Sequence, residues 1–125
     1  MKKNKIIFCI PNFNAGGAER VMINLFSEFN DQDNYLLVLN RYGTLKIEDK
    51  LKNKVLCLNK KRSRDALFSI IKTFNKVKPS IIISTIAYFN FIIMIANLLS
   101  FHKPNKIILR ESNIIKPTIK KKYLG

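Results

Sequence analysis

The sequence predicts a doubly wound parallel α/β fold, because short apolar runs and amphipathic helical segments alternate along it. Apolar residues make up 47% of the 125 residues and charged residues 25%, with only four glycines and four prolines, a composition typical of globular domains. A chain of this length fits one domain and is too short for two full domains of this kind. We therefore expect a single domain over residues 1–125, with helices on both faces of its sheet.

The first half of the chain predicts three strands and one long helix. Ile6 to Ile10 forms a buried strand that is closed by a proline and a glycine-containing loop. The second strand is expected over residues 35–39 and the third over 55–58, with one helical turn around 45–51 between them. The first helix follows the glycines, and its apolar stripe consists of Val21, Met22, Leu25, Phe26 and Phe29.

The second half predicts a helix over residues 66–77, a strand over 81–84, a mostly buried helix over 89–101 and a strand over 106–109. Residues 81–101 carry no charge, and this length could cross a bilayer. Polar residues interrupt the segment, however, and a buried parallel strand followed by a buried helix also gives a near-continuous apolar sequence. We therefore expect a strand and a helix in place of a membrane span.

We expect these strands to form a Rossmann-like sheet in the order 3-2-1-4-5. In such sheets a ligand binds at the carboxyl ends of the strands, at the switch point between the first and fourth strands. The loops after Ile10, Ser84 and Leu109 are therefore the expected binding loops. A complete half of this kind needs one more strand, so we expect the domain to be incomplete at its C-terminal end.

The charge balance favours anionic partners. The chain has 23 basic and 8 acidic residues, a net charge of +15, which attracts phosphorylated lipids, nucleotide diphosphates and nucleic acid alike. Nucleic acid is disfavoured because there is no recognition-helix signature and no aromatic residues interleave with the basic clusters. Neither GxxxxGK[ST] nor GxGxxG occurs, and Asn40 and Arg41 follow the second strand where a dinucleotide-binding protein would carry an acid.

The cysteines and the single histidine do not suggest a metal site. Cys9 and Cys57 lie in apolar runs without metal-ligand spacing, so we expect buried thiols. In the expected strand order they lie roughly 9.5 Å apart, beyond the ~7 Å limit for a disulfide, which favours a reducing, cytoplasmic setting. His102 is expected at the far end of its helix as a helix-end cation or a solvated residue, so no catalytic triad or zinc site is indicated.

The strongest local motif is NAGGAER at residues 14–20, between the first strand and the first helix. Glycines allow a ligand to approach the backbone closely, and the free amides of a helix N-terminus attract phosphate or diphosphate groups. The alternative is that Gly16 and Gly17 only make a tight turn. Glu19 and Arg20 would then solvate the first helical turn, with Glu19 favourably placed near a helix N-terminus.

The sequence GGAERV at 16–21, its continuation MINL at 22–25 and RESN at 110–113 resemble the N-terminal part of family 4 glycosyltransferases, which build bacterial capsule, lipopolysaccharide and related surface glycans. The resemblance implies a retaining GT-B enzyme, in which two Rossmann-like domains face each other across a cleft. The N-terminal domain holds a lipid-linked or oligosaccharide acceptor, and the C-terminal domain binds the nucleotide-sugar. Neither a metal nor another cofactor is implied.

Carried over to this chain, the resemblance places Gly16 and Gly17 in the cleft near the donor diphosphate, and Arg110 and Glu111 at the cleft floor. Asn90 is a candidate on the acceptor side, although capping of its helix is the competing role. Because the C-terminal domain is missing, we expect no turnover from this chain alone. The alternatives are a non-catalytic subunit of a split glycosyltransferase and, from the charge, a basic nucleic-acid-binding protein.

The excess of basic over acidic residues suits an enzyme that works in the cytoplasm, at the anionic inner face of the plasma membrane. The basic residues at 60–64 and 120–122 suit peripheral attachment to an anionic membrane surface, where each cation near the surface contributes about 1 kcal/mol. They are equally consistent with ordinary solvated surface.

Overall fold

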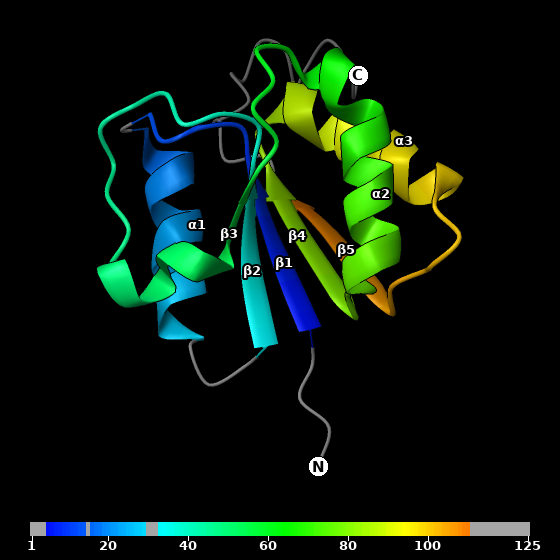
Figure 1. Cartoon of the computed structure of the whole chain (residues 1–125), viewed down its shortest axis with the longest axis horizontal. Coiled ribbons are helices and arrows are strands. Elements are labelled where there is room, and N and C mark those ends of the chain that lie inside the picture. The colour runs from blue at the N-terminus through cyan, green and yellow to red at the C-terminus, as the bar shows by residue number, and fades with distance from the viewer. Residues whose placement is uncertain (1–4, 15, 30–32, 111–125) are drawn as a thin grey trace, which may run out of the picture.

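Five parallel strands form one sheet in the order β3-β2-β1-β4-β5 (Figure 1), the order that the sequence predicted. The computed structural model describes residues 5–14, 16–29 and 33–110. The strands are β1 (Lys5–Ile10), β2 (Asp33–Val38), β3 (Val55–Cys57), β4 (Ile81–Thr85) and β5 (Lys106–Arg110). The predicted fold class, a Rossmann-like doubly wound parallel sheet, is therefore confirmed.

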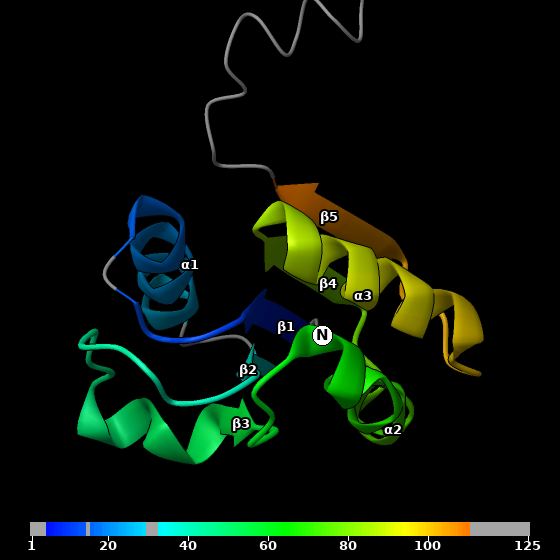
Figure 2. The same cartoon turned by 90° about the horizontal axis from the view of Figure 1, so that it is seen from above.

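Helices cover both faces of this sheet. Figure 2 shows α1 on one side and α2 and α3 on the other, as right-handed crossovers on the two sides of β1 require. The α-helices are α1 (Gly17–Glu28), α2 (Leu67–Val77) and α3 (Ala87–Leu99), and two short 3-10 helices are η1 (Asp49–Lys54) and η2 (Ser63–Ala66). The helix α2 ends at Val77, and its C-cap residue Lys78 has a left-handed conformation with φ 57°, before Pro79.

Two hydrophobic cores lie on the two faces of the sheet, since side chains alternate along each strand. In β1, Ile7 and Cys9 contact the core beneath α2 and α3, whereas Ile6, Phe8 and Ile10 contact the core beneath α1. The largest completely buried side chains include Phe8, Phe26, Phe74 and Phe89. Packing against these cores sets the position of α1 and α3 relative to the carboxyl ends of β1 and β4.

The uncharged segment over residues 81–101 divides into β4 and α3, as predicted. A sharp turn at Ile86, with φ 76° and ψ 121°, separates the two elements. The helix α3 therefore begins two residues before the predicted start at 89. Among the described residues, no helix has both the length and the apolar character needed to cross a membrane.

The stripe predicted for α1 is partly wrong. Met22 and Phe26 are buried as expected, but Val21 and Phe29 are 38% and 42% exposed, and Ile23 is buried instead. The buried face of α1 is therefore formed by Glu19, Met22, Ile23 and Phe26. Phe29, at the end of α1, still stacks against Phe8 with ring centroids 6.4 Å apart.

The crossover between β2 and β3 contains no α-helix. Its only helical element is η1, which begins later than the turn predicted around 45–51 and is anchored by the buried side chain of Leu51. The preceding loop is bound to the end of β1, where Phe13 and Gly43 form an isolated parallel bridge. Gly43 has φ 117°, and a Cβ at this position would lie 2.1 Å from the Phe13 carbonyl. Only glycine fits this contact.

Candidate functional site

The N-termini of α1 and α3 both lie at the switch point of the sheet, between β1 and β4. β1 and β4 are neighbours, with Phe8 aligned to Ile83 and Cys9 to Ser84, and α1 and α3 begin shortly after these two strands end. The first amide groups of each helix have no acceptor within the helix, and the helix dipoles add positive potential there. The carboxyl edge between β1 and β4 is therefore a suitable place for an anionic or hydroxyl-bearing ligand.

The two glycines of the motif have different surroundings. Gly16 caps α1 with φ −83° and ψ 162°, and a Cβ there would lie 2.6 Å from Glu19 Oε1. A Cβ on Gly17 would meet no atom within 4 Å. Because neither glycine has a positive φ, their role is to permit close approach and not a left-handed backbone. Gly16 is approached by Glu19, whereas the space beside Gly17 is open.

Glu19 is buried, with 7% of its surface exposed, so the alternative in which it simply solvates the first turn is wrong. It is the third residue of α1 and folds back toward the N-terminus of the helix, in the position of a capping-box glutamate. Burial, and then the charge of Glu19, raises the pKa of the Tyr88 phenol in α3. A carboxylate from α1 and a phenol from α3 are therefore close to each other at this edge of the sheet.

Asn90 connects α3 to the end of β5. Its Nδ2 donates a hydrogen bond of 2.8 Å to the carbonyl oxygen of Arg110. The helix begins at Ala87 with no side-chain cap, so the predicted capping role of Asn90 is wrong. The structure therefore brings together Asn90 and Arg110, two of the predicted site residues. Glu111 lies outside the described residues.

Some buried polar side chains near the carboxyl ends of β4 and β5 have atoms without a hydrogen-bond partner. Within the described part of the chain, Ser84 Oγ, Asn90 Oδ1 and Arg110 Nη1 are buried and have no hydrogen-bond partner. A buried polar group without a partner costs about 1–3 kcal/mol. A polar ligand group that reached one of these atoms would remove this cost.

A basic hollow of about 420 Å³ lies at the carboxyl ends of β2 and β3. Asn40 Nδ2 donates a 3.0 Å hydrogen bond to the Lys60 carbonyl and so joins the two loops that form it. Three cations and no carboxylate line it; the lining residues are Asn40, Arg41, Tyr42, Asn59, Lys60 and Lys61. Sequence reasoning did not identify this site, although basic residues following two adjacent strands were an available signal.

The remaining candidates lie elsewhere or do not form a site. The His102 ring is 2.6 Å from the Pro79 carbonyl, near the amino end of β4 and so at the opposite edge from the switch point. Cys9 is buried and Cys57 only partly buried, and both are free. The expectation that both thiols are buried is therefore wrong for Cys57. Nowhere in residues 5–14, 16–29 and 33–110 do three or more His, Cys, Asp or Glu side chains gather in a way that could hold a metal.

Comparison with known proteins adds no family to this description. No protein-family model matches the chain, and a search of curated proteins gives no match. Function must therefore be argued from the fold, the switch point and the motif residues themselves.

Proposed function

We propose that this chain is the acceptor-side, N-terminal domain of a retaining GT-B glycosyltransferase of the family 4 type. The full enzyme would move a sugar from a nucleotide-sugar to a lipid-linked or glycan acceptor in surface polysaccharide synthesis. The observation that carries the proposal is the position of the GGAER motif. Gly16, Gly17 and Glu19 lie at the start of α1, at the carboxyl edge next to β4, where doubly wound sheets bind their ligands.

The donor diphosphate would approach α1 on the side of Gly17. Glu19 already places a carboxylate beside Gly16, and a second anion there would be repelled. No atom lies within 4 Å of the position that a Cβ on Gly17 would take. The amides of the first turn of α1 are free to donate hydrogen bonds. Such donors stabilise the charge that develops on the departing diphosphate.

The acceptor hydroxyl would meet polar groups from α1, α3 and β5. The carboxylate of Glu19 can accept a hydrogen bond from a hydroxyl, and the Tyr88 phenol, whose pKa is raised, remains protonated and able to donate. The unpartnered atoms Asn90 Oδ1 and Arg110 Nη1 add an acceptor and a donor. A sugar hydroxyl can donate one hydrogen bond and accept another, so it can use both kinds of group.

The proposal includes two partners beyond the substrates. A second GT-B domain, joined to this one in cis or supplied in trans, would carry the nucleotide site, so no sugar transfer is expected from residues 1–125 alone. An anionic membrane surface is the other partner, supported by the net charge of +15 and by the exposed apolar face of α3. That face consists of Tyr88, Phe91, Met94, Leu98 and Leu99, with Phe101 following at 94% exposed.

The test is a substitution at Gly17 in the intact gene of the producing bacterium, with the transfer of labelled sugar to membranes as the measurement. Gly17→Val should leave the fold intact, because its side chain has space, yet obstruct the ligand. We expect a loss of about a hundredfold, since one good donor contact contributes about 3 kcal/mol to the barrier. Lys72→Gln, on the exposed surface of α2, is the control.

Circular dichroism should show the same folded state for both variants. If a folded Gly17→Val enzyme transfers sugar at the normal rate, the glycines serve only the turn and the proposed donor position is wrong. If deletion of the whole gene leaves the surface glycan unchanged, the proposed function itself is wrong.

A further inference from the structure

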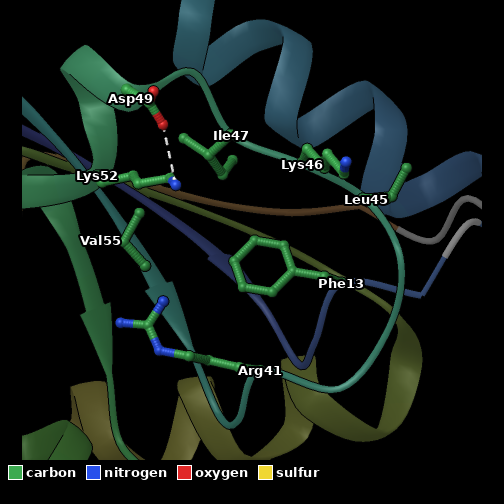
Figure 3. Close-up of a pocket in the computed structure, with 8 residues that line it drawn as sticks. All are labelled: Phe13, Arg41, Leu45, Lys46, Ile47, Asp49, Lys52 and Val55. Carbon is green, nitrogen blue, oxygen red and sulfur yellow. Dashed lines mark ion pairs between the residues drawn. The ribbon is translucent and has the colours of Figure 1, made fainter.

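The β2–β3 crossover leaves a hollow on the α1 side of the sheet. The connection after β1 contains a 12-residue α-helix, but this crossover contains only the six-residue η1, which does not fill the same space. A cavity of about 480 Å³ remains, within the usual range for small-molecule sites. The apolar residues of its wall are Phe13, Leu45, Ile47 and Val55, and Figure 3 shows the Phe13 ring pointing toward Val55, with Ile47 above it.

The wall of this crossover hollow is held in place by the backbone. Phe13 N donates a 2.7 Å hydrogen bond to the Tyr42 carbonyl, and Leu45 N donates a 2.9 Å bond to the Phe13 carbonyl. Gly43 lies between these bonds, with φ 117° and no room for a Cβ. The loop is thus held against the segment that follows β1, at the carboxyl edge of the sheet. The hollow is therefore formed by the fold itself.

Cations lie around the apolar wall. Lys52 forms a 2.9 Å ion pair with Asp49, so their charges compensate. Arg41 and Lys46 also line the hollow but have no acidic partner among the described residues. In Figure 3 the Arg41 side chain extends across the base of the hollow toward Val55. Apolar contact and uncompensated positive charge therefore occur together in one concave site.

Arg41 belongs to two sites. It lines the crossover hollow and also the basic hollow at the carboxyl ends of β2 and β3, beside Lys60 and Lys61. Arg41 therefore adjoins the apolar wall in one hollow and two further cations in the other. This arrangement matches a ligand that has an apolar chain attached to an anionic head.

We infer that the two hollows together bind a single-chain amphiphile with a phosphate head, the chain lying in the crossover hollow and the phosphate at Arg41, Lys60 and Lys61. Burial of a chain against Phe13 and Val55 gains hydrophobic free energy, and a guanidinium binds phosphate through two parallel hydrogen bonds. Inorganic phosphate alone would leave the apolar wall exposed to water. A neutral amphiphile would leave Arg41, Lys60 and Lys61 without an anionic partner. The site goes beyond the proposed function, because it requires neither a sugar nor a second domain.

The experiment titrates the 125-residue chain with dodecyl phosphate below its micelle-forming concentration, using calorimetry, with inorganic phosphate and neutral dodecyl maltoside as comparison ligands. We expect dodecyl phosphate to bind at least about tenfold more tightly than either, because only it uses both parts of the site. NMR shifts should then concentrate at Phe13, Ile47 and Val55. Equal affinity for all three probes overturns the inference.

Two charge variants distinguish a built site from general attraction to a basic protein. Arg41→Gln should weaken dodecyl phosphate binding at least about tenfold, whereas Lys72→Gln, which removes the same charge from the opposite face of the sheet, should change it less than about twofold. Equal weakening by both variants overturns the inference. Gly17→Val should leave this binding unchanged, so failure here is distinguishable from failure of the proposed transferase function.

A further comparison identifies the source of the amphiphile. If it comes from a bilayer, the chain should float with vesicles that contain phosphatidic acid, and Arg41→Gln should reduce this flotation more than Lys72→Gln does. If it is a free lipid phosphate, the chain should bind monomeric dodecyl phosphate without Arg41-dependent flotation. Both results support the site, and the absence of binding in both assays overturns it.

Discussion

Glu19 folds back over Gly16, so that its Oε1 atom lies 2.6 Å from the position that a Cβ at residue 16 would take. The contact explains why one motif contains both residues. A carboxylate on the third residue of a helix can fold back to the N-cap, and here it takes the space that a Cβ at residue 16 would need. The carboxylate then lies where the helix dipole favours negative charge.

Gly16→Ala should therefore destabilise the chain by about 1–2 kcal/mol, because alanine is a poor N-cap and displaces a buried carboxylate. Gly17→Ala should change the free energy of unfolding by less than about 0.5 kcal/mol, since its Cβ would meet no atom within 4 Å. Urea unfolding measures both. In a chain that already carries Glu19→Ala, Gly16→Ala should lower the free energy of unfolding by less than it does in the unmodified chain. An equal loss in both chains would show that the contact between residues 16 and 19 does not contribute to stability.

Ile86 holds a positive φ of 76° between β4 and α3, which is strained for a β-branched residue. Such a conformation costs of order 1–3 kcal/mol, and only glycine adopts it freely. We expect Ile86→Gly to be more stable than Ile86→Ala by about 1 kcal/mol in urea unfolding, although both lose the same half-buried side chain. The reverse order would mean that the turn relaxes without strain.

The matched control is an ordinary helical position. At Lys72 in α2 the alanine variant should be more stable than the glycine variant by about 1 kcal/mol, as helix propensity requires. Opposite signs at positions 86 and 72 identify backbone conformation as the cause.

The apolar face of α3 leads to a prediction about membranes. Leu98 and Phe101 are 70% and 94% exposed, and together with the net charge of +15 they should attach the chain to anionic vesicles. The double variant Leu98→Gln, Phe101→Gln should weaken binding at least about tenfold, because each side chain contributes roughly 1.5–3 kcal/mol when buried. Sedimentation with phosphatidylserine vesicles measures this.

High salt should weaken vesicle binding of the unmodified chain as well, since screening shortens the Debye length from about 10 Å at 0.1 M to about 3 Å at 1 M. Lys72→Gln is the control for general charge loss. If the double variant binds vesicles as tightly as the unmodified chain, α3 is not the face that attaches to the membrane.

The strands and helices could be predicted because their signals are local, and the strand order followed from the doubly wound fold that alternating strands and helices form. Runs such as Ile6 to Ile10 and the apolar periodicity of α2 need only neighbouring residues to be recognised. Contacts between distant segments could not be predicted in this way. The Asn90–Arg110 hydrogen bond joins residues 20 apart, and the Phe13–Gly43 bridge depends on how a loop meets the end of β1. The start of α3 was missed because a turn at positive φ usually carries glycine, and this one carries Ile86.

Glu19 shows an intermediate case. Its spacing of three from Gly16 is the capping-box spacing, so its position over the helix N-terminus was available from the sequence. Its burial was not, because burial depends on how distant segments pack in the assembled fold. The open space beside Gly17 likewise follows only from the assembled fold.

The last prediction concerns Cys9, which is completely buried in β1. Burial raises the pKa of its thiol well above the ordinary value of 9.0, because the thiolate cannot be solvated in the core. Above about pH 9 the unfolded chain therefore releases a proton that the folded chain keeps. The unfolded state then binds fewer protons, so this residue should lower stability by about 1.4 kcal/mol for each further pH unit. Below the ordinary pKa its contribution is constant.

Urea unfolding at a series of pH values from about 8 to about 10.5 measures this effect as the difference between the unmodified chain and Cys9→Ala. Subtracting the variant removes the titration of lysines and tyrosines, which both proteins share. We expect the difference to be constant near pH 8 and then to change in favour of Cys9→Ala as the pH rises. A thiol reagent provides the independent check: in the folded chain it should modify the partly exposed Cys57 rapidly and Cys9 only at the rate of unfolding. A difference in stability that does not vary with pH, together with rapid modification of Cys9, would show that β1 is not enclosed as the fold requires.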